Sequence, residues 1–96
     1  MAGIMRSFTY PAMFEPGEGP GILVVTFRDV PEAISQGDDA ADAHAMGSDA
    51  LGVALLALVQ LDRPIPAPTP PEPGEVLLTV EPELEAEINA LLQRGD

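Results

Sequence analysis

The sequence predicts an α+β domain with the element order βββα, a proline-rich crossover, then βα. Near the start, aromatic and small apolar residues occupy every second position, which is the period of a strand. In the middle, apolar residues recur at helical spacing. Several prolines separate that stretch from a last apolar strand and an amphipathic helix. Because the chain has 96 residues, we expect a single domain over 1–96.

The first predicted strand carries its rings on one face. The alternating residues are Phe8, Tyr10, Ala12 and Phe14. Pro11 lies between them and has no N–H to donate, which favours either an edge strand or a position whose nitrogen points away from the partner strand. Residues 15–21 are rich in turn formers and predict a hairpin loop.

Two further strands complete a predicted three-stranded antiparallel meander. Residues 22–27 are β-branched and aromatic, and their continuous apolarity predicts a strand covered on both faces. Asp29 and Pro31 end this strand, and residues 33–36 predict the third.

A helix follows, with Asp39 placed to cap it and Asp42 favourable in its first turn. The stripe that we expect to face the core consists of Ala43, Met46, Ala50, Val53 or Ala54, Ala57, and Leu58 or Leu61. Gly47 and Gly52 each cost the helix about 1 kcal/mol relative to alanine, which is tolerable if the helix lies close against the sheet. The apolar run 51–61 is shorter than the ~20 residues that cross a bilayer, so we expect no membrane partner.

The prolines between 64 and 73 predict an extended connector. An internal crossover explains them without a partner, whereas a polyproline ligand would need one. Residues 75–80 predict the fourth strand, and Pro82 fits the first position of a C-terminal helix that Arg94 and Gly95 would end. The apolar stripe of this helix consists of Leu84, Ile88, Leu91 and Leu92.

The net charge limits the classes of partner that the chain is expected to bind. The chain has 16 acidic residues against 4 arginines and no lysine, for a net charge of -12. Such a surface repels phosphate backbones and attracts cations, so we expect no direct nucleic-acid binding, although acidity also serves solubility alone. The chain lacks cysteine, and residues 1–8 lack the apolar core of a signal peptide, so we expect a cytoplasmic protein.

No motif predicts catalysis, a cofactor or a metal site, and we expect no enzyme. His44 is the single histidine and is expected to be an ordinary helix residue. Asp38, Asp39 and Asp42 lack the pattern of a calcium loop, so helix capping explains them better than a cation. Residues 17–21 are glycine-rich but have no lysine and precede a strand, unlike a phosphate-binding loop.

Several short sequence motifs, in this order along the chain, resemble those of the HicB family of antitoxins. They are YPAMFE (10–15), VVTF (24–27), DVPEA (29–33), QGD (36–38) and RPIPAP (63–68), followed by a strand and helix over 76–92. The resemblance covers nearly the whole chain.

This resemblance implies a partial ribonuclease H-like fold without nuclease activity. It also implies an antitoxin of a type II toxin–antitoxin system, which neutralises HicA, a small basic toxin that cleaves mRNA, by covering it. The exposed acids of the meander and helix start are the toxin-binding residues that we expect: Asp29, Glu32, Asp38 and Asp42.

The sequence departs from the family at two points. Arg28 stands where a proline is usual, which we expect to alter the bend after the second strand. The family usually continues into a DNA-binding module, and we expect no complete C-terminal module of that kind here, which puts operator binding in doubt.

Other possibilities stay open. An orphan HicB-like regulator would bind a different partner, and a neighbouring gene for a small basic protein with one histidine would argue against it. A ribonuclease H-like nuclease would need carboxylates that converge on two metals, whereas residues 8–14 and 22–27 contain none. We also expect a homodimer or higher homo-oligomer, formed through an exposed sheet end or through the apolar stripe of the last helix.

Overall fold

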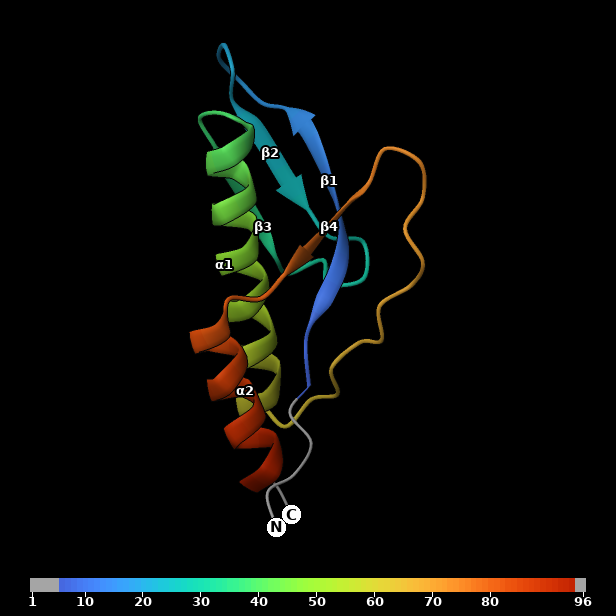
Figure 1. Ribbon diagram of the computed structural model, residues 1–96, viewed down its shortest axis with the longest axis vertical. Helices are drawn as coiled ribbons and strands as arrows, with labels where there is room; N and C mark the ends of the chain where they lie inside the picture. The colour runs from blue at the N-terminus through green and yellow to red at the C-terminus, as the bar shows by residue number, and fades with distance from the viewer. Residues whose placement is uncertain (1–5, 95–96) are drawn as a thin grey trace.

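The computed structural model describes residues 6–94, which form a four-stranded antiparallel sheet and two helices (Figure 1). The elements are β1 (Thr9–Pro16), β2 (Leu23–Thr26), β3 (Ile34–Gly37), α1 (Ala40–Gln60), β4 (Val76–Thr79) and α2 (Pro82–Arg94). The strand order is β3-β2-β1-β4, so the predicted α+β class, with its meander, crossover, fourth strand and last helix, is confirmed. Residues 1–5 and Gly95 lie outside the described residues. The prediction that Gly95 ends the last helix, and the interpretation of residues 1–5 as lacking a signal peptide, therefore concern residues that the structure does not describe.

β1 is an inner strand, with its first half paired to β4 and its second half to β2. The Val80 N–H donates to the Phe8 carbonyl at 2.9 Å, which makes this a hydrogen-bonded pair. Because such pairs alternate along an antiparallel ladder, Pro11 opposite Leu77 falls at a non-hydrogen-bonded position. Its nitrogen points away from β4, and pairing with β2 begins only at Met13. Of the two predictions for Pro11, the edge strand is wrong, because β1 lies inside the sheet, and the position whose nitrogen points away from the partner strand is confirmed.

One face of the sheet packs on α1 and forms the core. The register places on this face the buried residues Phe8, Tyr10, Ala12, Val25, Phe27, Leu78 and Val80. On the opposite face Val24 and Thr26 are half-buried and Leu77 is exposed. The expectation that residues 22–27 are covered on both faces is therefore met in full only on the side of α1, because the other side is covered in part: Pro11 is buried there, and Val24 and Thr26 are half-buried.

The buried face of α1 differs from the predicted stripe. The helix buries Ala43, Gly47, Ser48, Leu51, Gly52, Leu55 and Leu58. Of the predicted stripe only Ala43 and Leu58 belong to this set, while Met46, Val53 and Leu61 are exposed. The helix was therefore predicted at the right place, but the face that it turns toward the core is rotated about the helix axis from the predicted one.

Two glycines account for the rotation. A Cβ atom on Gly47 would lie 2.8 Å from Leu78 Cδ1 and 2.9 Å from Val25 Cγ1, and one on Gly52 would lie 2.6 Å from Leu84 Cδ1. The helix thus approaches the sheet at Gly47 and α2 at Gly52 too closely for a side chain. Because glycine has no side chain, it adds nothing to an apolar stripe in the sequence, and the neighbouring face of α1 therefore looks more apolar than the face that is buried.

The start of α1 is as predicted: the Asp39 carboxylate accepts the Asp42 N–H at 2.8 Å and caps the helix. The helix has 21 residues and is, by length and composition alone, able to cross a membrane. The prediction based on residues 51–61 underestimated this length. Only 39% of the most apolar 18-residue stretch of the helix is buried within the protein, which leaves part of its apolar surface uncovered.

After α1 the chain makes a long extended crossover before β4 (Figure 1). The buried Tyr10 hydroxyl donates to the Pro66 carbonyl and ties the crossover to β1. Burial raises the pKa of this hydroxyl above its ordinary value, and nearby Arg6 opposes part of the effect.

α2 lies beside the C-terminal half of α1 (Figure 1). Of its predicted stripe, Ile88 is buried in the core and Leu84 and Leu92 pack against it, whereas Leu91 is half-buried outside it. Buried Asn89 fixes its position further, because its side-chain oxygen accepts the Arg6 N–H and its amide donates to the Arg6 carbonyl, each at 2.9 Å. These hydrogen bonds join the segment before β1 to the last helix, two parts of the chain that are 83 residues apart in the sequence. Because Ile88, Leu84 and Leu92 pack on the core, the α2 stripe offers less free surface for a dimer than the sequence alone indicates.

Candidate functional site

Arg28, in the turn after β2, holds the crossover against the meander. Its guanidinium donates to both carboxylate oxygens of Glu75, at 2.9 Å each, and also to the Thr69 hydroxyl and the Pro70 carbonyl. The hydrogen bond from Arg28 lowers the pKa of Glu75, helped by the Glu72 N–H, and the same pair raises the pKa of Arg28. The sequence marked Arg28 only as a replacement for proline and held no signal for a partner 47 residues away.

The first expected toxin-binding residue, Asp29, belongs to this same cluster. Its carboxylate accepts the Thr69 N–H and the Thr69 hydroxyl at 2.9 Å, and lies 3.7 Å from Arg28. Only 10% of the side chain is exposed. Asp29 is therefore committed to the crossover and offers a partner little of its charge.

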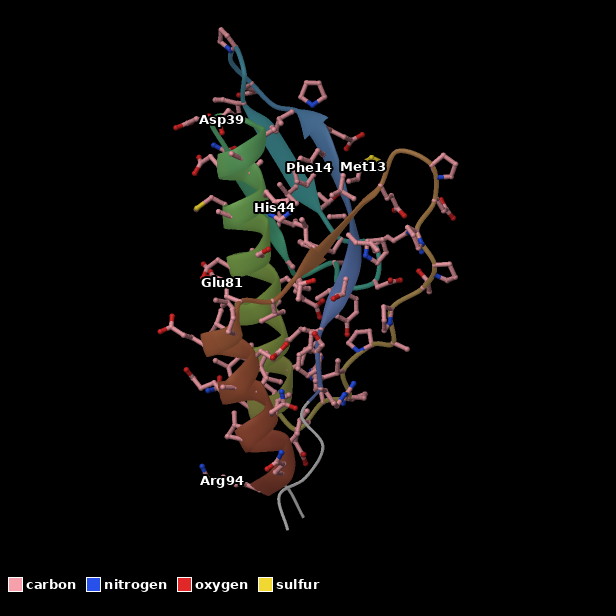
Figure 2. The ribbon with its side chains drawn as sticks, in the orientation of Figure 1. Met13, Phe14, Asp39, His44, Glu81 and Arg94 are labelled. Atoms are coloured by element: carbon pink, nitrogen blue, oxygen red, sulfur yellow. The ribbon has the colours of Figure 1, made fainter. Side chains whose placement is uncertain are left out.

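Asp38 and Asp42 lie together at the start of α1, where Figure 2 shows their neighbour Asp39. The Asp42 carboxylate accepts the Asp38 N–H at 2.9 Å, while the Asp42 N–H donates to Asp39, so Asp42 takes part in the helix cap. The Asp38 side chain is exposed and has no ion-pair partner within residues 6–94. Of this pair, Asp38 has the freer charge.

Glu32 lies apart from these residues, just before β3. It is exposed, and in the described part of the chain its carboxylate has no ion-pair partner. The structure thus divides the four expected acids into two that stabilise the fold, Asp29 and Asp42, and two that are available to a partner, Glu32 and Asp38.

A groove of about 550 Å³ runs between β3 and α1, and Glu32 lies at its rim. We call it the α1–β3 groove; it is lined by Glu32, Ile34, Asp49, Ala50, Val53, Ala54, Ala57, Leu58, Leu61 and Arg63. Three of its residues are large, apolar and exposed: Ile34 at 63%, Val53 at 53% and Leu61 at 67%. Its α1 side is largely the stripe that the sequence assigned to the core, so the apolar signal was found but given the wrong role.

Nothing in the described structure resembles a catalytic centre. His44 is exposed on α1 (Figure 2), and among residues 6–94 no three His, Asp or Glu side chains gather as metal ligands would. β1 runs to Pro16 and so includes one acid, Glu15, beyond the acid-free stretch 8–14, but that residue is exposed. The arrangement is suited to binding another protein through an apolar groove with an acidic rim.

The chain matches a known protein family over most of its length. Residues 9–86 match the model of a family described as the HicB_like antitoxin of bacterial toxin-antitoxin system. Antitoxin HicB 1 of Photorhabdus laumondii subsp. laumondii is 39% identical over 67 residues, which are 70% of this chain and 43% of that protein. Antitoxin HicB 2 of the same bacterium is 35% identical over 91 residues, covering 92% of this chain and 63% of that protein. The chain thus spans about half of the length of these relatives.

A solved structure has the same fold. A chain of the structure described as "Toxin-Antitoxin complex from Streptococcus pneumoniae" aligns with a TM-score of 0.68 and covers 85% of this chain and 72% of that chain. The two are 22% identical, so the likeness concerns the fold.

Proposed function

Since the chain belongs to the HicB-like antitoxin family of bacterial toxin–antitoxin systems, we propose that it neutralises a HicA-like mRNA interferase by direct protein contact. The observation that carries the proposal is the family match over 9–86, a range that contains all four strands and α1. The match thus spans the whole sheet, α1 and the start of α2. In this proposal the domain covers the toxin and prevents its access to RNA.

The charge of the chain supports a cationic partner. An mRNA interferase needs a basic surface to hold the phosphate backbone, and a protein with a net charge of -12 competes for that surface. Attraction of this kind chiefly raises the association rate, while apolar contacts set the lifetime of the complex.

The toxin contacts that we propose include the acids of the meander and helix start: Asp29, Glu32, Asp38 and Asp42. Glu32 and Asp38 are the ones to test, because their side chains are exposed and free of ion pairs within residues 6–94. Asp29 and Asp42 bind the chain's own backbone, so replacing them would alter the fold and the interface together.

Charge reversal of the two free acids tests the proposal. We expect the double variant Glu32→Lys, Asp38→Lys to associate with the toxin about three- to tenfold more slowly than the wild type at 0.1 M salt. Raising the salt to 1 M should shrink this difference, because the Debye length falls from about 10 Å to about 3 Å. The measurement is the association rate on an immobilised HicA-like toxin.

The matched control is Glu83→Lys, Glu87→Lys, which changes the net charge equally at two exposed positions of α2. We expect it to slow association less than the test variant. Equal slowing by both variants would mean that the meander acids have no special place in the encounter.

A second candidate function is that of an orphan regulator with another partner. The discriminating observation is the gene neighbourhood: a small basic protein with one histidine encoded next door favours the antitoxin. A nuclease is disfavoured by the lack of converging carboxylates in the described sheet.

The remaining features of the proposal follow from family and charge. We propose a cytoplasmic protein that makes no direct contact with nucleic acid through residues 1–96, all part of one antitoxin domain. Self-association into a homodimer would use the sheet edge at β4, where Val76 and Leu77 are exposed, because the α2 stripe lies against α1.

A further inference from the structure

We propose that the α1–β3 groove receives the apolar part of the toxin's contact surface, with basic toxin residues beside it. This inference rests on the proposed function and assigns the toxin a site on the chain that the acids alone do not define.

The first support is the uncovered surface of α1. The helix is apolar around most of its circumference, yet the sheet and α2 cover only the face that contains Gly47, Leu51 and Leu55. A helix that is apolar all round is normally buried all round. Along the other face, Val53 and Leu61 remain exposed at helical spacing. This surface is therefore available to a partner.

The second support is the shape of the site. Ile34 of β3 lines the same groove as Val53 and Leu61, so the edge strand and the helix that follows it together form one apolar hollow. β3 is an edge strand, and no strand of the described chain pairs with its outer side. A partner seated in the groove would also find unpaired backbone groups there.

The charge around the groove identifies the occupant. Glu32 and Asp49 line it against one cation, Arg63. A basic protein would gain from this rim, whereas a second copy of the chain would bring a further charge of -12 toward it. An anionic membrane surface is repelled for the same reason, although α1 is apolar enough to suit one.

The test replaces exposed apolar residues of the groove by a charge. We expect Val53→Glu and Leu61→Glu each to weaken binding of a purified HicA-like toxin at least tenfold, measured by isothermal titration calorimetry. Ala90→Glu, at an exposed position of α2, is the matched control and should change the affinity less than twofold. Because the replaced side chains are exposed, all three variants should unfold at the wild-type temperature.

The outcomes separate the groove from the proposed function. If the wild type binds the toxin and both groove variants bind equally well, the groove assignment is wrong and the antitoxin function stands. If the wild type itself does not bind, the proposed function fails and the groove assignment falls with it. A wild-type dimer in sedimentation that Val53→Glu converts to monomers would assign the groove to a second copy. Flotation of the wild type but not Val53→Glu with phosphatidylglycerol vesicles would assign it to lipid, and either result overturns the proposal.

Discussion

At the scale of single residues, the polar side chains that matter most hold segments far apart in the sequence together. Arg28 joins the turn after β2 to the crossover through Glu75, and Asn89 joins the last helix to the segment before β1. Neither link could be predicted, because each depends on two loops or ends meeting only after folding. The Asp39 cap, by contrast, involves a partner three residues away and was predictable from local sequence.

The Arg28–Glu75 pair predicts a dependence of stability on pH. The ordinary pKa of a glutamate is 4.5, and Arg28 lowers that of Glu75 in the folded chain. A lowered folded pKa contributes stability above the unfolded value, and this contribution is lost as the pH falls through the folded value. We therefore expect Glu75→Gln to be less stable than the wild type at pH 7, with the difference shrinking as the pH falls below 4.5.

The measurement is the free energy of unfolding by urea at several pH values between 3 and 7. Glu18→Gln serves as the control, since Glu18 is exposed in the hairpin loop and makes no ion pair within the described chain. A difference between wild type and Glu75→Gln that stays constant with pH would contradict this account of Arg28.

At the scale of elements, α1 shows how far sequence reasoning reaches. Its cap, its place after the meander and its apolar character were all predictable, but its orientation was not. The core face contains Gly47 and Gly52, where the helix comes closest to its neighbours, and a residue without a side chain carries no hydrophobic signal. The more visible stripe through Val53 and Leu61 therefore lines the groove instead of the core.

This close approach predicts a steric cost at Gly47. The variant Gly47→Val should lose about 1–3 kcal/mol of unfolding free energy, because the new side chain would clash with Leu78 and Val25. Ala45→Val, on an exposed part of the same helix, should lose no more than about 0.7 kcal/mol through helix propensity. Equal losses in urea unfolding would show that α1 does not approach the sheet at Gly47.

At the scale of the whole molecule, fold and family were predictable because they rest on patterns spread along the chain. Strand and helix periods, the crossover prolines and the HicB-like phrases agree with one another, and the observed α+β fold and family match confirm them. The candidate site was predictable only in its charge. Which acids remain free, and that Glu32 lies beside an apolar groove, depends on tertiary contacts that no local pattern encodes.

Neutralisation of the toxin tests the central claim most directly. Purified toxin is incubated with a labelled RNA and increasing amounts of this chain at low salt, and the rate of RNA cleavage is measured. We predict that cleavage falls to background as the chain reaches a fixed molar ratio to the toxin, because each bound antitoxin blocks one RNA site. Cleavage that continues unchanged in the presence of excess chain would contradict the antitoxin function.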